Sequence, residues 1–406
     1  MIEQSAIGLN SRSEANPYNE DGFLPLITAP IYSTVDESNY QVFLDNKIQV
    51  CLPRNNKFRK RAIGCFEALS LSEFESYYCN SIITIHELHR VCIDTAAGHL
   101  KKLHEAIRKA KEIHGDNLII MAGNVASVEA FVALAQTGVD YVRVGIGGGG
   151  AGEGGCTTTS NVGVGQENLE ELIKECYRLR EVEKNGIEYL KQQNLFQKVD
   201  QKASQSLANV KIVADGISSY IKLCQEKYGF NDNGYAAINK LLFSGADLVM
   251  VGKLFAQCTI SAGEKSFKTK DGDFRTDIEY GTLSRKEAVE LYFKRNELYV
   301  KYAGMSTHTE QKKYKNPVIN SGGVAIMDLK TGDIEILKEP DTPVYLNLKP
   351  SEGSVKWIPV RFLLKEWLEG NDNQDEYPYL MGWINSIKSA MSYTGLKTLK
   401  DINNKK

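Results

Sequence analysis

The sequence predicts an α/β fold, an eight-stranded (β/α)8 TIM barrel, and three observations carry this prediction. Short apolar or β-branched runs recur eight times between residues 24 and 253. These runs are apolar almost throughout, as parallel strands buried on both faces are. Helical stretches separate several of them. In the segment 99–115, four apolar residues recur at helical spacing opposite the charged ones: Leu100, Leu103, Ile107 and Ala110.

The eight runs are assigned to parallel strands and the segments between them to crossover helices. The strands are expected at residues 24–31, 48–53, 62–68, 90–95, 117–123, 141–147, 211–216 and 248–253. Between the sixth and seventh strands, the long charged segment 167–210 is expected to form a mostly helical insertion. We expect one catalytic domain over residues 1–406, with its barrel core at about 23–310.

The last third of the chain departs from the barrel rhythm. Residues 284–303 have the pattern of a helix, 318–345 resemble a β-hairpin with a Lys-Thr-Gly-Asp turn, and 361–395 return to a helical pattern. Residues 311–406 are therefore expected to add a C-terminal hairpin and helices to the barrel.

The charge balance argues against nucleic acid and membranes as partners. The chain has 406 residues, with 49 Lys and Arg against 51 Asp and Glu, a net charge of −2. That balance gives no field of the kind that binds phosphate backbones or anionic membranes, so a small ligand is expected. No apolar run is long enough for a membrane helix, and the start has no signal-peptide pattern, so we expect a cytoplasmic protein. The eight cysteines form no CxxC pair, which favours reduced thiols.

The most informative segment is a glycine-rich loop at 145–165, directly after the sixth expected strand. Ten of its 21 residues are glycine, and it contains Cys156. Glycine allows positive φ and close backbone approach, so the loop can present main-chain groups to a ligand or ion. A flexible surface linker is the alternative. A thiol among glycines and threonines at the catalytic end of a barrel instead favours a nucleophile.

Several motifs occur in the order in which one enzyme family has them, and the chain resembles the family of IMP dehydrogenase and GMP reductase over residues 23–400. The motifs are Gly123-Asn124-Val125, Cys156-Thr157-Thr158 with Val162-Gly163-Val164-Gly165, Ala214-Asp215-Gly216, Met250-Val251-Gly252, Tyr302-Ala303-Gly304-Met305-Ser306, Ser351-Glu352-Gly353 and Tyr393-Thr394-Gly395. The resemblance implies a (β/α)8 enzyme that acts at C2 of a purine nucleoside monophosphate. Members form a thioimidate between a cysteine and C2, because a thiolate divides one difficult substitution into two easier steps.

The resemblance also implies roles for individual residues. Cys156 would be the nucleophile, with Thr158 and Glu352 as a proton relay. Asp215 would accept hydrogen bonds from the ribose diol; a helix N-cap is its alternative role. Asp94 and Asn124 would lie on the nicotinamide side, or would cap the helices that follow. The phosphate would be bound by residues of three turns: Gly216, Gly252, Lys253, Tyr302, Gly304, Met305 and Ser306. A monovalent cation such as K+ would be held by Gly147, Gly149 and Cys156.

Three features favour the reductase over the dehydrogenase. The regulatory domain pair that most dehydrogenases carry after the second strand is absent. No arginine lies between Lys315 and Ser351, where dehydrogenases have an arginine-tyrosine flap. The turn 304–307 with Lys312-Lys313-Tyr314 resembles the reductase version. We therefore expect NADPH-dependent deamination of GMP to IMP, and the resemblance implies a homotetramer. NAD-dependent oxidation of IMP to XMP, a related purine-ring activity and a non-catalytic nucleotide-binding barrel are the alternatives.

The chain also departs from the family pattern at several positions. Tyr32-Ser33 replaces a methionine-aspartate after the first strand, and Arg54 ends the second strand where a histidine-lysine is common. The glycine loop is longer than in the family and contains Glu153, and Thr159 replaces an arginine. These departures identify a remote member.

Overall fold

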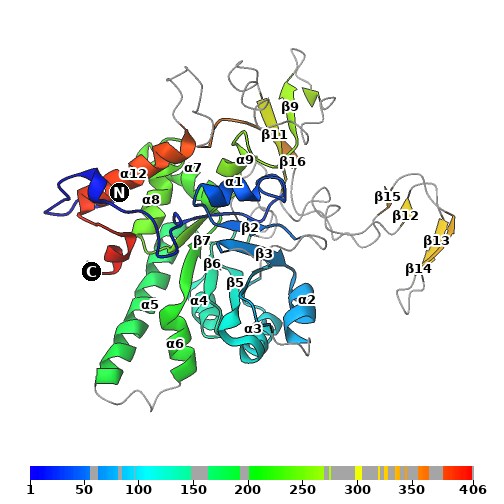
Figure 1. The fold of residues 1–406 in the computed structure, drawn as a ribbon, viewed down its shortest axis with the longest axis horizontal. Coiled ribbons are helices and arrows are strands. Elements are labelled where there is room, and N and C mark those ends of the chain that lie inside the picture. Colours follow the sequence, from blue (N-terminus) through cyan, green and yellow to red (C-terminus); the bar gives the residue numbers. More distant parts are fainter. Residues whose placement is uncertain are drawn as a thin grey trace.

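The structure is a computed structural model, and it describes most of the barrel and parts of the C-terminal third (Figure 1). The described residues are 1–54, 63–80, 85–95, 97–147, 163–192, 201–268, 274–275, 298–303, 319–320, 324–327, 334–338, 343–344, 355–364 and 378–404. No helix within these ranges has the length and apolar character needed to cross a membrane.

The predicted barrel is confirmed, because all eight expected strands are present and pair in parallel. Their bounds are β1 Leu26–Thr28, β2 Val50–Leu52, β3 Cys65–Leu69, β4 His89–Asp94, β5 Leu118–Val125, β6 Tyr141–Val144, β7 Lys211–Ala214 and β8 Leu248–Val251. Each strand from β2 to β7 pairs with the next one along the chain, and β8 pairs with β1. A parallel bridge between Ile27 and Gln49 brings β1 beside the residue that precedes β2, which completes the ring.

Helices surround the strands, as the periodicity of the sequence predicts. Their bounds are α1 Tyr40–Asp45, α2 Leu71–Phe74, α3 Lys101–His114, α4 Val128–Ala135, α5 Leu169–Gln192, α6 Gln201–Asn209, α7 Ile217–Tyr228, α8 Tyr235–Phe243, α9 Lys253–Ala256 and α12 Tyr379–Thr394. In α3 the buried positions include Leu103, Ile107 and Ala110, at the spacing that places them on one face. Short 3-10 or π segments occur at Arg12–Glu14, Glu75–Cys79, Gly115–Asn117 and Leu399–Asn404.

The predicted helical insertion between the sixth and seventh strands is confirmed as the pair α5 and α6. The two helices pack against each other and extend past the N-terminal ends of the barrel strands (Figure 1). Arg180 of α5 attaches the pair to the barrel, because its guanidinium donates to the main-chain oxygen of Val210 at 3.2 Å and pairs with Asp247.

Two apolar layers hold the barrel together. Alternation along each strand directs one set of side chains inward and the other toward the helices. The inward set is Ile27, Ala29, Cys51, Phe66, Ala68, Cys92, Met121, Val213, Leu248 and Met250. The outer set packs against α3 to α8 and contains fully buried side chains such as Val142 and Ile212. Each such side chain contributes about 1.5–3 kcal/mol by leaving water.

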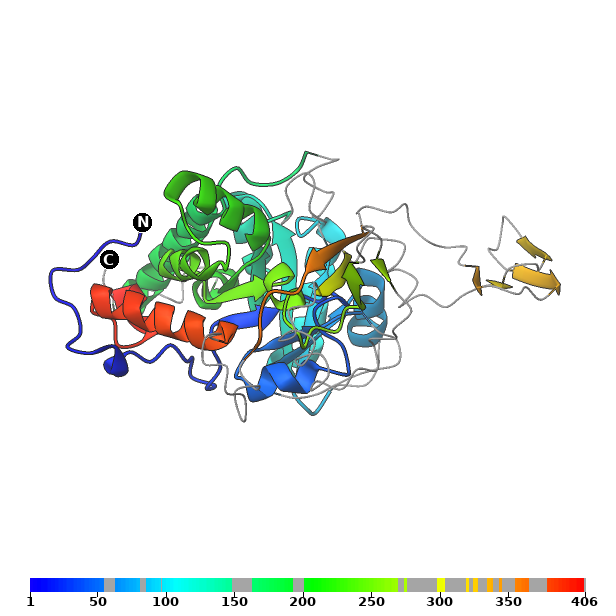
Figure 2. The same ribbon diagram turned by 90° about the horizontal axis from the view of Figure 1, so that it is seen from above.

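The C-terminal third confirms two predictions and corrects two. The predicted hairpin is present as the antiparallel pair β13 Val324–Met327 and β14 Ile334–Lys338, beside β12 Ile319–Asn320 paired with β15 Pro343–Val344. The predicted C-terminal helix is present as α12, which lies along α8 (Figure 2). However, residues 361–364 of the expected helix are extended, and Phe362 forms a parallel bridge with Cys258.

The helix expected at 284–303 is wrong at its end, where residues Leu298–Ala303 form strand β11. This strand lies in an antiparallel sheet with β9 Lys265–Lys268 and β16 Val355–Pro359, and β10 Phe274–Arg275 pairs with β9. Leu298, Val300 and Tyr302 are buried at every second position. That period of two belongs to a strand, and partners distant in the sequence decide it.

Candidate active site

Polar side chains enter the barrel at the C-terminal ends of its strands. Asp94 ends β4 two residues after the inward-facing Cys92, and Asp215 follows β7 two residues after the inward-facing Val213. Arg143, the third residue of β6, lies between outward-facing neighbours and also points into the barrel. Barrel enzymes bind their substrates at this end, so these side chains define the candidate active site.

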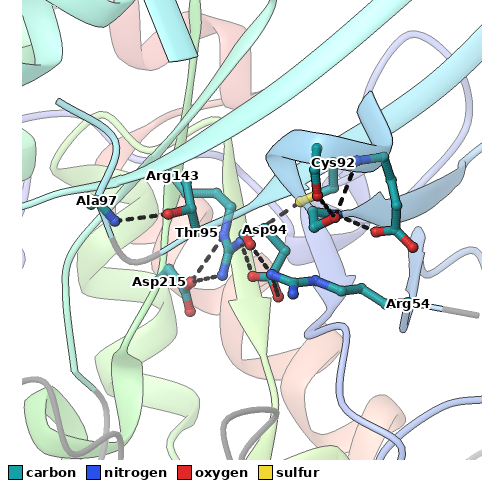
Figure 3. Close-up of polar contacts among 10 residues, drawn as sticks. Arg54, Cys92, Asp94, Thr95, Ala97, Arg143 and Asp215 are labelled. Carbon is teal, nitrogen blue, oxygen red and sulfur yellow. Dashed lines mark hydrogen bonds and ion pairs between the residues drawn. The ribbon is translucent and has the colours of Figure 1, made fainter. Parts of the chain in front are cut away.

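The guanidinium of Arg143 lies between two carboxylates (Figure 3). Its Nη1 is 2.8 Å from Asp94 Oδ1, and its Nη2 is 2.9 Å from Asp215 Oδ2. Its Nε donates to the same Asp215 oxygen at 3.2 Å. Arg54, after β2, approaches the other oxygen of Asp94 at 3.3 Å. Two guanidinium groups and two carboxylates therefore form one neutral network that extends from the end of β2 to the end of β7.

Burial and the neighbouring charges have opposite effects on the pKa values of Arg143 and Asp94. The Arg143 side chain is 8% exposed and that of Asp94 15%. Burial by itself would lower the pKa of Arg143, but Asp215 and Asp94 raise that pKa well above its usual value. Burial would likewise raise the pKa of Asp94, but Arg54 and Arg143 hold it below its usual value. Asp94 is therefore a hydrogen-bond acceptor at neutral pH and a poor proton donor.

Two buried thiols lie at the inner side of the network. Arg143 Nη1 donates to Cys92 Sγ at 3.7 Å. A hydrogen bond from the Cys51 thiol lowers the pKa of Cys92, burial opposes this, and the charge of Arg143 lowers the pKa further. Arg143 thus has acceptors on three sides, which fixes its orientation in the barrel.

Asn124 contacts Asp215, although the sequence suggests a place for it on the nicotinamide side. Its Nδ2 donates to Asp215 Oδ2 at 2.8 Å and to the main-chain oxygen of Gly145 at 2.6 Å. The second oxygen of Asp215, Oδ1, accepts from the main-chain N–H of Gly216 at 2.7 Å. Since each carboxylate oxygen can accept more than one hydrogen bond, Oδ1 keeps capacity for a ligand hydroxyl.

The base of the glycine-rich loop packs directly on the turn that contains Asp215. A Cβ added to Gly216, whose φ is +74°, would lie 2.1 Å from the main-chain oxygen of Gly147. A Cβ on Gly145, at φ +115°, would lie 2.3 Å from the main-chain oxygen of Asp215. Only glycine fits at both positions. At the far end of the loop, Gln166 Oε1 accepts from the Ile146 N–H at 2.8 Å, which holds the two ends of the loop together.

The alternative roles as helix caps are wrong for Asp94, Asn124 and Asp215. None of the three occupies the N-cap position of the helix that follows it. The N-cap residues of α3, α4 and α7 are Leu100, Ser127 and Gly216. The polar atoms of the three side chains instead face one another around Arg143.

The expected phosphate turns after β8 and in β11 lie together. A Cβ added to Gly252 would be 3.4 Å from the Tyr302 hydroxyl oxygen. The main-chain oxygen of Gly252 accepts from Thr34 Oγ1 at 3.2 Å and from the Ala256 N–H at 2.9 Å. Lys253, the first residue of α9, is half-buried beside this turn.

The remaining expected site residues lie outside the described residues, and their roles stay predictions. They are Cys156, Thr158 and Glu352 of the expected catalytic set, Gly149 of the cation site, and Gly304, Met305 and Ser306 of the phosphate turn. Gly147, the other main-chain member of the cation site, is described and contacts Gly216 as above. Within the described ranges, no cluster of three or more His, Cys, Asp or Glu side chains could hold a metal ion.

Reasoning from the sequence missed Arg143 entirely and treated Arg54 only as a departure from the family pattern. A signal for Arg143 exists, because it interrupts the apolar strand Tyr141–Val144 at an inward position. A buried cation in such a place requires a carboxylate partner. Arg54 is held by Tyr32, whose hydroxyl donates to the main-chain oxygen of Arg54 at 2.5 Å. Two departures from the family pattern therefore contact each other.

The fold and the site define a class of protein: a (β/α)8 barrel with an ionised polar site at the C-terminal ends of its strands. A family model for the IMP dehydrogenase / GMP reductase domain matches residues 68–190. A GMP reductase of Caenorhabditis elegans is 27% identical over 324 residues, which is 80% of this chain and 60% of that protein. An inosine-5'-monophosphate dehydrogenase of Chlorobaculum parvum is 32% identical over 174 residues, 43% of this chain and 26% of that protein.

A solved structure supports the fold assignment independently. The inosine 5'-monophosphate dehydrogenase of Legionella pneumophila superposes with a TM-score of 0.54 at 19% identity, covering 100% of this chain and 94% of that one. The aligned part of the chain spans less than two thirds of the length of the relatives compared by sequence. Residues 68–190 are therefore similar to the domain of the IMP dehydrogenase / GMP reductase family, and most of the chain aligns with a GMP reductase.

Proposed function

We propose that the protein is an oxidoreductase that uses NADPH to convert GMP to IMP with release of ammonia. The observation that carries this proposal is the network of Asp94, Arg143 and Asp215, which offers one carboxylate acceptor on each side of a shared cation. Two ligands with ribose hydroxyl groups can donate to the two carboxylates. The GMP reductase relative, aligned over 80% of the chain, supports the reductive direction.

The nucleotide would lie between the turn at Asp215 and the turn at Gly252. Asp215 would accept from the ribose diol through Oδ1, while Arg143 and Asn124 hold Oδ2. The phosphate would be held by the three turns that the family resemblance indicates, at Gly216, Gly252 with Lys253, and Tyr302 to Ser306. The proximity of Tyr302 to Gly252 supports this arrangement.

The proposed reaction begins at Cys156. Its thiolate adds to purine C2, the bond from C2 to the exocyclic nitrogen breaks, and ammonia leaves with a proton passed by Thr158 and Glu352. The product is a thioimidate on Cys156. NADPH, when bound, supplies the hydride that reduces C2. The C2–sulfur bond then breaks, and Cys156 recovers its thiolate with the electron pair of that bond.

Asp94 suits the cofactor side of this site. Arg54 and Arg143 keep it ionised, and it is 15% exposed at the end of β4. An ionised carboxylate accepts hydrogen bonds from ribose hydroxyls more strongly than a neutral group does. We further propose a monovalent cation at Gly147, Gly149 and Cys156, and assembly as a homotetramer, as the family resemblance implies.

The second candidate is NAD-dependent oxidation of IMP to XMP. Relatives named as dehydrogenases favour it, including one of Halalkalibacterium halodurans that is 30% identical over 208 residues, 51% of this chain. The third candidate is a barrel that binds a purine nucleotide without catalysis.

One pair of assays separates the three candidates. Absorbance at 340 nm should fall when the protein is mixed with GMP and NADPH. A rise with IMP and NAD, without a fall in the first assay, would support the dehydrogenase. No change in either assay, with nucleotide binding by calorimetry and no adduct on Cys156 by intact mass, would support the non-catalytic barrel.

A further inference from the structure

Lys265 is a buried cation that the proposed mechanism does not use. It begins β9 and is 6% exposed. Among the described residues, no carboxylate forms an ion pair with it. Its Nζ instead donates to the main-chain oxygens of Ser261 and Gly263, the latter at 3.4 Å. The ammonium therefore binds two carbonyl groups of the loop 261–264, which precedes its own strand.

A charge is unfavourable in this buried position, which indicates that the hydrogen bonds from Lys265 to the carbonyl oxygens have a role of their own. Burial lowers the pKa of Lys265 to about 8, and the charges of Asp36 and Cys258 oppose this shift only in part. A buried apolar side chain would fill the space without that cost. A methionine could not donate to the two carbonyl oxygens.

The loop 261–264 that Lys265 binds is itself hydrogen-bonded to the turn after β1. The Ala262 N–H donates to the main-chain oxygen of Thr34 at 3.3 Å, and the Gly263 N–H to that of Ser33 at 3.2 Å. Asn39 supports the same contact, since its Nδ2 donates to the main-chain oxygens of Thr34 at 3.0 Å and Ile260 at 2.8 Å. A Cβ on Gly263 would lie 3.1 Å from the Ser33 oxygen, so the two backbones are in close contact.

The turn after β1 contacts the expected phosphate turn. Thr34 is fully buried, and its Oγ1 donates to the main-chain oxygen of Gly252 at 3.2 Å. The peptide group between Gly252 and Lys253 is planar, so a carbonyl held in one direction aims the Lys253 N–H in the opposite direction. The hydroxyl of Thr34, together with the Ala256 N–H that donates to the same oxygen, therefore sets the direction of a main-chain donor at the place where the nucleotide phosphate is proposed to bind.

We infer that Lys265 is a positioning residue for nucleotide binding: through the loop 261–264 and Thr34, it orients the main-chain turn at Gly252 that receives the phosphate. The inference rests on the proposed function, because it assumes that a nucleoside monophosphate binds at this turn. Lys265 does not touch the ligand. It acts through its own bonds to the loop carbonyls, the main-chain bonds from the loop to the turn after β1, and the hydroxyl of Thr34.

The test is a double-mutant cycle read by calorimetry with GMP and, separately, with NADPH. Lys265→Met and Thr34→Val should each raise the dissociation constant for GMP about tenfold, the equivalent of one hydrogen bond. The combined variant should bind GMP no more weakly than the weaker single variant, because both changes interrupt one path. The dissociation constant for NADPH should stay unchanged. Additive losses, equal losses for both ligands, or GMP binding at the wild-type level would overturn the inference.

The matched control is Lys111→Met at the opposite end of the barrel. Lys111 is also a largely buried lysine that donates to a main-chain oxygen, that of Leu118 at 2.7 Å, and it pairs with Asp140. Its loss should lower the melting temperature without changing the affinity for GMP. A weakened affinity for GMP in this control would show that any loss of stability has the same effect, and would overturn the inference.

Hydrogen exchange of the unliganded protein separates this inference from the proposed function. In Lys265→Met, the amides of Ala262, Gly263 and Ala256 should exchange faster than in the wild type, while those of α3 should not. Wild-type protein that binds no purine nucleotide would refute the proposed function. Unchanged exchange at these three amides would refute the role of Lys265 in either case.

Discussion

Arg143→Met removes the cation that holds Asp94 and Asp215 together. Breaking a buried ion pair from one side costs about 3–5 kcal/mol. We expect the lower end, about 3 kcal/mol in the free energy of unfolding at pH 7. The reason is that Asp94 keeps Arg54 at 3.3 Å and Asp215 keeps the hydrogen bond from Asn124 at 2.8 Å. Urea unfolding measures this loss.

The same change should weaken nucleotide binding, because Asp215 loses the two donors that orient Oδ2. We expect the dissociation constant for GMP to rise about tenfold to a hundredfold, or about 1.4–2.7 kcal/mol. Arg180→Met is the matched control, since Arg180 is equally buried and pairs with Asp247 at the other end of the barrel. That variant should lose a similar amount of stability and bind GMP normally.

The pH dependence of Arg143→Met has a definite sign. The pKa of Asp94 is lowered in the folded protein, so its contribution is present above its unfolded pKa of about 3.9 and is lost as the pH falls below it. The stability difference between wild type and variant should therefore narrow as the pH falls below about 4. Adding Asp215→Asn to the variant should restore part of the stability at pH 7. A variant with wild-type unfolding energy and wild-type affinity for GMP would refute this account of the network.

Three further changes test separate parts of the account. Cys156→Ala should abolish turnover and leave the dissociation constant for GMP within about tenfold by calorimetry, since only the covalent step is lost; substantial turnover would exclude that step. Glu352→Gln should slow ammonia release from GMP by about 10²–10⁴, whereas reduction of XMP by NADPH should suffer much less; equal losses would contradict its role in the proton relay. Glu170→Gln should cost about 3 kcal/mol in urea at pH 7, because burial would raise the pKa of Glu170 but hydrogen bonds from Lys174 and Lys240 lower it from 4.5 to about 2. That cost in the free energy of unfolding should disappear as the pH falls from 4.5 to 2. A cost independent of pH would contradict its origin in the charge of Glu170.

The barrel could be predicted because its strands are short and apolar, and helical stretches separate most of them. These are local signals, and the confirmed insertion at α5 and α6 carries another, its helical periodicity. Strand β11 could not be predicted in this way. Its pattern over Leu298–Ala303 fits either a helix or a strand, and its pairing with β16, which starts at Val355, decides the outcome.

The candidate site could be predicted where a carboxylate follows the apolar residues of a strand at its C-terminal end, as Asp94 and Asp215 do. The link between them could not, because Arg143 acts through two carboxylates that are 49 and 72 positions away in the chain. Only the parallel pairing of β4 to β7 brings the three together. Asn124 shows the same limit: its place at the end of β5 was predictable, but its contact with Asp215 depends on the inward turn of both strand ends. The assignment of residues 1–406 to one catalytic domain stays a prediction.

The central claim is that this barrel removes the amino group from GMP with electrons from NADPH. The most direct test measures ammonia and the loss of absorbance at 340 nm in the same reaction of wild-type protein with GMP and NADPH. The proposed reaction requires one ammonia released for each NADPH oxidised, and no oxidation of NADPH when GMP is omitted. Unchanged absorbance and no ammonia with GMP, while IMP and NAD give a rise at 340 nm, would contradict it.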